Sequence, residues 1–348
     1  MKNWQKIKQN DGLKQQFLVR EQVIDSLRVF FKTRGFHEVE TPLLVKSPGT
    51  EPYLEVFDTT VKFAEGDSYP AYLLTSPEYA MKKLLAAGFG DIFQICKSFR
   101  NKEGRSSRHN PEFTILEYYR ANADYTALMK DMEEMLPALA EARYGKEGRN
   151  GFEYQDLDID LTLPFPRYSV EQAFLKFAGV SREELLSETK LIEVAKKKGY
   201  QVTSDTTWEQ VYNQIFLNEI EAKLDKTRPT IIYDYPLSQA ALSKRKASDP
   251  EFAERFEIYL AGIELGNAFS ELIDGEEQEK RLKAELRERD ALGKTKYELD
   301  TDFIDALKSG LPECTGIAIG VDRLVMLLAN VPSIEDTLLF PINELFPS

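Results

Sequence analysis

Apolar residues at helical intervals mark the first part of the chain. They recur over the stretch "FLVREQVIDSLRVFFKTRG" at Leu18, Val19, Val23, Leu27, Phe30 and Phe31. This spacing predicts a helix, and Gly35 ends it because glycine favours the turn that follows a helix. The next residues, "FHEVETP", predict a strand. Pro42 belongs at an edge or an end of the sheet because proline has no amide hydrogen to donate.

Two further strands are predicted around a long polar loop. The stretch "AYLLTSPEYAMKKLLAAGFGDIFQICKSFRN" (71–101) predicts a strand, a turn at Ser76 and Pro77, a short helix closed near Gly88, and a second strand. After about ten polar residues, "FTILEYYRA" alternates apolar and polar side chains as a strand does. This order is typical of an antiparallel pair joined by an extended hairpin.

The second half of the chain alternates helical blocks with runs of strands. The patterns from 124 to about 145 and from about 169 to 226 are mainly helical, whereas "PTIIYDYP", "RFEIYLAGIEL" and "TGIAIG" predict strands. Strands grouped in runs favour an α+β fold with an antiparallel sheet over a doubly wound parallel sheet. We expect one domain over residues 1–348, with a helical insertion at about 124–226.

Composition narrows the classes of function. The chain has 42% hydrophobic and 30% charged residues and a net charge of −13, whereas dedicated nucleic-acid binders carry a broad basic face. Any phosphate site should therefore be local. The two cysteines lack the spacing of a zinc site, and no stretch has the apolar run of a leader peptide or membrane span. These features predict a cytoplasmic protein with no membrane partner.

Cations gather in the polar loop of the hairpin, "SFRNKEGRSSRHNPEFTILEYY". Arg100 ends one strand and a run of loop cations follows, which comprises Arg105, Arg108 and His109. Glu117 and Tyr119 lie on one face of the next strand because strand side chains alternate. Arginine forks suit phosphate groups, so the hairpin predicts an anion site. A solvated, charged hairpin tip is the alternative.

A second candidate site lies in "TGIAIGVDRLVMLLAN". Gly316 and Gly320 flank a short strand that leads directly into a helix, and Arg323 falls in the first helical turn. A cation there opposes the helix dipole unless an anion is also bound. The alternative is an ordinary turn with Arg323 in a surface salt bridge.

Three carboxylates complete the set of candidates. Glu264 and Glu271 lie in "GIELGNAFSELID", and Glu78 follows a proline turn in "TSPEYAMKK". Carboxylates beside a phosphate site suit magnesium, and a further carboxylate suits a substrate ammonium. Residues seven apart share a face of a helix but not of a strand, so spacing alone leaves their convergence open.

These residues carry a resemblance to a known family. The segments "RGFHEVETP", "FRN…RHNPEFTILEYY" and "GIAIGVDRL" resemble the three signature motifs of class II aminoacyl-tRNA synthetases, and "TSPEYAMKKLL" and "IELGNAFSEL" are similar to the lysyl type. The resemblance implies the class II catalytic fold, an antiparallel sheet flanked by helices. The first motif begins at about residue 34, so we expect no N-terminal OB-fold.

Within this family the chain resembles the free-standing lysyl-tRNA synthetase paralogues that ligate (R)-β-lysine to elongation factor P. Ala318 stands where lysyl-tRNA synthetases have the middle glycine of their third motif. The resemblance implies an ATP-dependent ligase that forms an aminoacyl-adenylate and transfers it to a lysine of elongation factor P. It further implies ATP as substrate, Mg²⁺, a homodimer and no tRNA partner.

The resemblance also assigns site residues by position. The residues at amino-acid contacts are Ser76, Pro77, Glu78, Tyr119, Glu271 and Ala318. The residues at ATP contacts are Arg100, Asn101, Glu103, His109, Asn110, Glu264, Leu265, Gly320 and Arg323. Arg100 and Arg323 would be the catalytic cations, Glu271 would pair with the distal ammonium, and Glu264 and Glu271 would bind magnesium. The loop is one residue longer than the lysyl pattern, so aligning Glu103 treats Lys102 as inserted.

Three other functions stay open on the sequence. They are a truncated lysyl-tRNA synthetase, an ammonia-dependent asparagine synthetase, and an inactive synthetase-like module that binds amino acids or a partner. Retention of all the charged motif residues argues against an inactive module, and the lysyl-type pocket argues against the asparagine enzyme. The choice between (R)-β-lysine, lysine and another diamino acid stays open.

Overall fold

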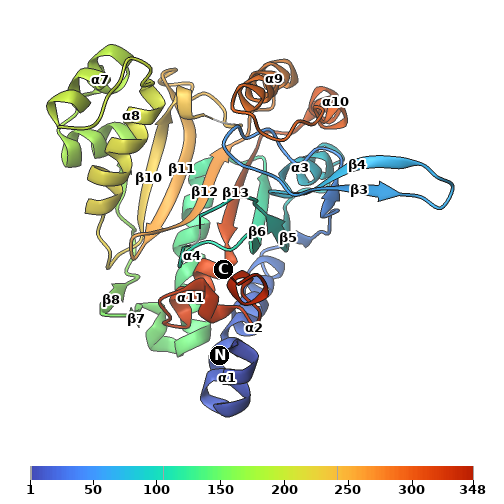
Figure 1. Ribbon diagram of the computed structural model, residues 1–348. Helices are drawn as coiled ribbons and strands as arrows, with labels where there is room; N and C mark the ends of the chain where they lie inside the picture. Colours follow the sequence, from blue (N-terminus) through green and yellow to red (C-terminus); the bar gives the residue numbers. More distant parts are fainter. Residues whose placement is uncertain (1, 105, 241, 348) are drawn as a thin grey trace.

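The computed structural model describes residues 2–104, 106–240 and 242–347, and its centre is an eight-stranded sheet (Figure 1). In spatial order the strands are β1 (His37–Glu38), β5 (Ile92–Phe99), β6 (Glu112–Ala121), β13 (Cys314–Gly320), β12 (Ile263–Ser270), β11 (Phe252–Leu260), β10 (Thr230–Pro236) and β9 (Arg167–Ser169). The edge pairs β1–β5 and β9–β10 are parallel, and the pairs between them are antiparallel. The predicted α+β class with a mainly antiparallel sheet is confirmed.

One face of the sheet is buried under long helices. These are α2 (Asp11–Lys32), α4 (Tyr125–Tyr144) and α11 (Val321–Leu328), which pack on one another and on β6, β12 and β13. Aromatic residues dominate the contact: the Phe31 ring stacks on Phe93 with centroids 4.9 Å apart and lies 4.6 Å from Tyr118. Burial of this apolar layer leaves the other face of the same strands available to line a site.

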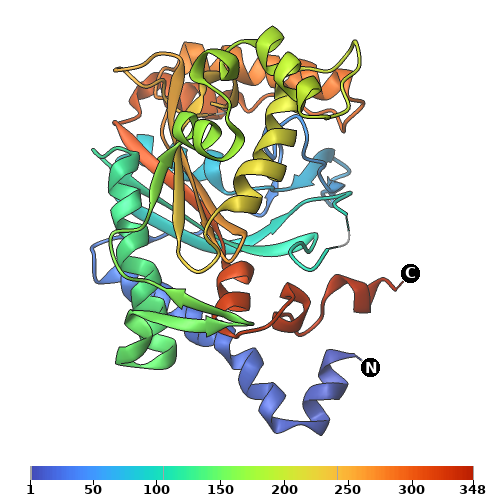
Figure 2. The same ribbon diagram turned by 90° about the vertical axis from the view of Figure 1, so that its left-hand side faces the viewer.

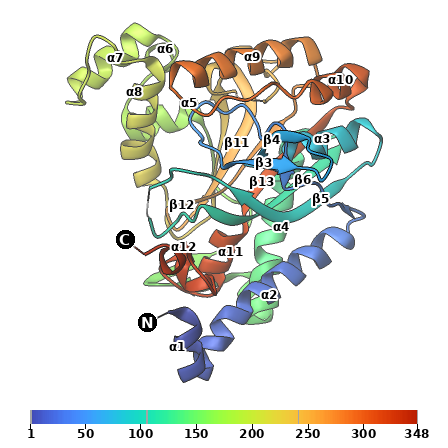
Figure 3. The ribbon, with the colours of Figure 1, turned by 45° about the vertical axis from the view of Figure 1, so that its right-hand side comes forward.

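Helices α3 (Glu78–Ala86), α9 (Gly275–Ala291) and α10 (Thr301–Gly310) cover one end of that other face (Figure 3). Met81 and Phe303 pack there with Tyr119 and Phe269 from the sheet. A small sheet, β2 (Leu44–Val45), β4 (Ser68–Leu73) and β3 (Asp58–Lys62), continues beside α3, and its β3–β4 hairpin projects from the body (Figure 1).

The segment after α4 folds around a second core. Its helices are α5 (Val170–Ala173), η2 (Phe174–Ala178), α6 (Arg182–Leu185), α7 (Glu188–Lys197), α8 (Trp208–Ile215), η3 (Phe216–Ile220) and η4 (Glu221–Lys223). These helices lie beside the main sheet (Figure 2). They bury Phe174, Tyr212 and Ile215 against Tyr235 and Tyr259 of the sheet.

The predicted helical insertion at about 124–226 also contains strands. After η1 (Lys146–Arg149), β7 (Gly151–Tyr154) and β8 (Leu157–Asp160) form a hairpin, and β9 adds a parallel edge to the main sheet. The reason is local: Phe152 and Ile159 alternate with polar residues on either side of a turn in which Gln155 has φ +51°.

The two ends of the chain meet below the sheet (Figure 2). Helix α1 (Asn3–Gln9) packs on the C-terminal segment, which contains η6 (Ile334–Thr337) and α12 (Ile342–Leu345). The side-chain Nδ2 of the buried Asn3 donates to the backbone carbonyls of Glu335 at 3.1 Å and Leu338 at 2.9 Å. Within the described residues, no helix combines the length and apolarity needed to cross a bilayer.

Candidate active site

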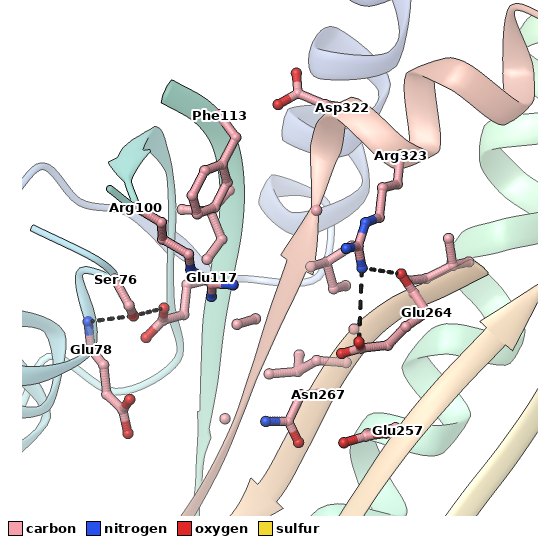
Figure 4. A pocket seen from close by; sticks show the side chains of 18 of the residues that line it. Ser76, Glu78, Arg100, Phe113, Glu117, Glu257, Glu264, Asn267, Asp322 and Arg323 are labelled. Atoms are coloured by element: carbon pink, nitrogen blue, oxygen red, sulfur yellow. Dashed lines mark hydrogen bonds and ion pairs between the residues drawn. The ribbon is translucent and has the colours of Figure 1, made fainter. Parts of the chain in front are cut away.

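A cavity of about 400 Å³ opens on the face of the sheet opposite the long helices (Figure 4). Strands β6, β11, β12 and β13 form its floor, and the loop after β5, the start of α3 and the start of α11 form its walls. The predicted residues that line it are Ser76, Glu78, Arg100, Glu103, His109, Asn110, Tyr119, Glu264, Leu265, Glu271, Ala318, Gly320 and Arg323. The fold therefore brings residues from distant parts of the chain into one cavity.

Two predicted residues are absent from this lining. Pro77 precedes α3 and lines a neighbouring hollow, and Asn101 donates to the Val56 carbonyl at 3.3 Å. Lys102 also faces away, with its ammonium 3.4 Å from Glu55 Oε2, whereas Glu103 lies in the cavity wall. Arg105, one of the predicted loop cations, lies outside the described residues.

Two arginines give one end of the cavity a positive charge. Arg100 follows β5 and lies 5.2 Å from the Phe113 ring centre, and its Nε is buried with no hydrogen-bond partner among the described residues. Arg323 donates from Nη1 to the Glu264 carbonyl oxygen at 2.6 Å. A buried donor without a partner is costly, so this end suits an anionic ligand.

His109 orients one of these arginines. Its Nε2 lies 3.2 Å from Arg323 Nη2, and its Nδ1 lies 2.9 Å from Ser106 Oγ. Burial and the charges of Arg323, Arg100 and Arg108 lower the pKa of His109, against the opposing charge of Glu103. Because a guanidinium can only donate, the neutral imidazole accepts at Nε2 and carries its hydrogen on Nδ1.

The C-terminal segment holds the cationic loop in place. Asn110 is buried, donates to the Glu112 carbonyl at 2.6 Å and accepts from the Ile342 amide at 3.1 Å. The Ile334 amide donates to the Ser107 carbonyl at 2.9 Å. Asn110 lies in the cavity wall and joins the backbone at the start of β6 to the backbone of the C-terminal segment.

Carboxylates give the opposite end a negative charge. Glu117 on β6 is buried and accepts from Ser76 Oγ and from Tyr119 OH, both at 2.6 Å (Figure 4). Burial, and then the charge of Glu78, raise the pKa of Glu117 to about 8. Strand alternation predicts Glu117 on the same face as Tyr119, but the family resemblance assigns Glu117 no contact.

A lysine that none of the sequence motifs singles out lies among these acids. Lys82 is 2% exposed, and its ammonium lies 2.5 Å from both Glu78 Oε1 and Glu271 Oε2. Burial outweighs this cation and raises the pKa of Glu271 to about 8. The spacing of Glu78 and Lys82, four apart on α3, was the signal that could have found the pair.

A bulge in β12 lets Glu264 and Glu271 face the same cavity. Tyr259 of β11 pairs with Glu264 and Ile258 with Gly266, so Leu265 is an extra residue that shifts the alternation by one. The two carboxylates nonetheless lie at opposite ends of β12, because seven residues of strand span roughly 20 Å. We therefore place the two carboxylates in different parts of the cavity, and their joint binding of magnesium stays a prediction.

The acid beside Glu264 is Glu257 on β11. Both line the cavity, and burial together with the charge of Glu257 raises the pKa of Glu264 to about 7. Arg255 Nη2 pairs with Glu257 Oε1 at 2.6 Å. The described residues contain no group of three or more candidate metal ligands. Two carboxylates near Arg100 and Arg323 still fit magnesium, which takes one or two carboxylates and completes its shell with phosphate and water.

The fold, the three motif segments and this divided cavity define a synthetase-type catalytic domain. The family model "tRNA synthetases class II (D, K and N)" matches residues 2–344, and the chain belongs to this family.

Two groups of relatives are similar at nearly the same identity. The lysine–tRNA ligase of Pelotomaculum thermopropionicum is 38% identical over 340 residues, which cover 96% of this chain and 65% of that protein. The elongation factor P–(R)-β-lysine ligases of Salmonella typhi and Haemophilus ducreyi are 39% and 37% identical over 94% and 95% of this chain, and 95% and 94% of their own lengths. The chain thus spans about two thirds of the lysine–tRNA ligases that it matches.

Proposed function

We propose that the protein is an ATP-dependent ligase that activates a diamino acid, (R)-β-lysine or lysine, as an aminoacyl-adenylate and transfers it to a lysine of elongation factor P. One observation carries the proposal: a single cavity has an arginine end suited to phosphates and a carboxylate end suited to two ammonium groups. The match to elongation factor P ligases over 94–95% of their lengths supports the acceptor.

Activation would take place where the two ends meet. The carboxylate of the amino acid attacks the α-phosphorus of ATP, and the bond to pyrophosphate breaks as the new bond forms. Arg100 would neutralise the charge that builds on the phosphoryl oxygens, and Arg323, oriented by His109, would hold pyrophosphate. The protein would contribute mainly positioning and electrostatic stabilisation.

Recognition of the amino acid would rest on the carboxylate end. Glu117, held by Ser76 and Tyr119, and Glu78 would bind the ammonium nearer the carboxyl group, and Glu271 would bind the distal one. Ala318 lies in the floor between the two ends. Its methyl group narrows the space that the backbone of the amino acid enters, and one methyl discriminates by only about 1–3 kcal/mol.

Magnesium fits beside the phosphates, with Glu257 and Glu264 as its carboxylates. When bound, it would supply charge neutralisation on the phosphate oxygens. Arg255 pairs with Glu257, which keeps that carboxylate turned toward the cavity. In the second step the uncharged amine of the acceptor lysine attacks the adenylate carbonyl. An amide forms, a proton leaves the amine, and AMP departs.

Amino-acid-dependent ATP–pyrophosphate exchange tests the activation step. We expect exchange with (R)-β-lysine or lysine and far weaker exchange with norleucine, which lacks the distal amine. Purified elongation factor P is then added with ATP, and its mass should rise by one acyl group. Absence of exchange with every diamino acid would refute the proposal.

The similarity to lysine–tRNA ligases favours one other function, transfer of the activated amino acid to tRNA. The net charge of −13 argues against it because tRNA binding relies on a basic face. A charging assay with tRNA from the same organism separates the two. Exchange without charged tRNA, but with modified elongation factor P, would support the ligase.

We further propose a homodimer through the first motif. Val29 on α2 and Leu44 on β2, which flank the first motif in the sequence, are 62% and 44% exposed. Exposed apolar side chains favour burial against a second copy. Analytical ultracentrifugation should give a dimer, and a monomeric mass at micromolar concentration would contradict it.

A further inference from the structure

We propose that Lys82 is a positioning residue that sets the charge of the carboxylate end, so that the cavity selects ligands with two ammonium groups. This inference rests on the proposed function, because it concerns the amino-acid end of the same cavity. Lys82 comes from the buried side of α3, and Glu78 and Glu271 lie on either side of its ammonium.

Lys82 engages only part of each carboxylate. It contacts Oε2 of Glu271, and Oε1 of Glu271 has no hydrogen-bond partner among the described residues although the side chain is fully buried. Gly316 lies beside that oxygen: a Cβ at 316 would be only 2.8 Å from it. Because residue 316 has no side chain, the Tyr119 ring and the Glu271 carboxylate both pack against β13 there. A buried acceptor without a donor favours a ligand that brings one.

The charges of the walls then match a diamino acid. When Glu78, Glu117 and Glu271 are ionised, they carry three negative charges, and Lys82 reduces the total to two. Glu51 also lines the cavity, but burial and the charge of Glu78 raise its pKa, and in its protonated form it adds no charge. Two ligand ammonium groups neutralise this remainder, whereas a single ammonium leaves one buried carboxylate without a counter-ion. Uncompensated buried charge is strongly unfavourable. A ligand with one amine is therefore rejected by charge.

Lys82 is fixed by its surroundings. Its ammonium lies 5.4 Å from the Phe269 ring centre, its side chain is 2% exposed, and both of its acid partners lie within 2.5 Å. Such a pair of contacts holds the Glu271 carboxylate in one orientation before the ligand arrives, which reduces the cost of ordering it on binding.

The test compares Lys82→Met, which keeps length and removes charge, with Lys82→Arg, which keeps charge. Lys83→Met is the matched control, because Lys83 is the next residue of the same helix and pairs with Asp300 and Asp302 outside the cavity. The measurement is kcat and KM in pyrophosphate exchange for lysine, (R)-β-lysine and norleucine, together with the KM for ATP.

We expect Lys82→Met to reduce the preference for the diamino acid over norleucine, in kcat/KM, by at least tenfold, mainly through KM for the diamino acid. The KM for ATP should stay unchanged, Lys82→Arg should restore most of the preference, and Lys83→Met should match the wild type. If the wild-type protein catalyses exchange and Lys82→Met keeps the same preference, the inference is overturned and the ligase proposal stays intact. Absence of wild-type exchange would instead refute the ligase proposal.

A measurement on the wild-type protein covers the case in which Lys82→Met does not fold. Side-chain ¹⁵N spectra of lysine-labelled protein should contain a protected ammonium signal that disappears in Lys82→Arg. Addition of lysine should shift that signal, and addition of norleucine should not. A Lys82 signal that is unaffected by lysine would overturn the inference.

Discussion

Gly316→Ala is the sharpest single perturbation of the amino-acid end. A Cβ at this position would lie 2.3 Å from Cε1 and 2.6 Å from Cδ1 of Tyr119, and 2.8 Å from Oε1 of Glu271. Carbon atoms in ordinary contact are about 3.5–4.0 Å apart, so the Tyr119 ring must move by about 1 Å. That ring is 2% exposed and its hydroxyl bonds Glu117, so the movement also displaces Glu117.

Overpacking of this kind costs about 1–3 kcal/mol, which corresponds to roughly five- to 150-fold in an equilibrium constant. We expect Gly316→Ala to lower the melting temperature and to raise the KM for the amino acid at least about tenfold, with the KM for ATP nearly unchanged. Gly320→Ala is the comparison, because its Cβ would meet only side-chain carbons of Arg323, at 3.4 Å or more. It should leave the KM for the amino acid unchanged. Wild-type values of both KM and melting temperature in Gly316→Ala would refute this reasoning.

Three other predictions concern the charged groups. Arg323→Ala should raise the KM for ATP at least about tenfold while leaving the KM for the amino acid unchanged, because Arg323 lies only at the phosphate end. The KM for the amino acid should fall as pH rises from about 6 to about 8. The reason is that Glu117 and Glu271 have pKa values raised to about 8, and a protonated carboxyl cannot form an ion pair with an ammonium. A KM that rises or stays constant over this range would contradict the prediction. Glu257→Gln should increase the magnesium concentration needed for half-maximal exchange several-fold, whereas Glu271→Gln should not change it. The reverse result would favour Glu264 and Glu271 as the magnesium ligands.

Features set by neighbouring residues were accessible from the sequence. The alternation in "FTILEYY" put Glu117 and Tyr119 on one strand face, and both line the cavity. The cationic hairpin, the strand leading into α11 and the mainly antiparallel sheet likewise follow from spacing and from turn residues. Local periodicity reports which face a side chain takes, and that information depends only on a few adjacent residues.

Which charged groups meet was decided by the tertiary structure. One extra residue, Leu265, turns Glu264 and Glu271 to the same cavity while strand length keeps them apart, and only the pairing with β11 reveals it. Glu257 lies next to Glu264 because of that pairing, and Lys82 reaches Glu271 because α3 packs over the end of β12. Neighbouring residues along the chain specify the elements and the kinds of charge they carry. Their partners were decided by the register of strands and the packing of a helix, since these contacts join residues far apart along the chain.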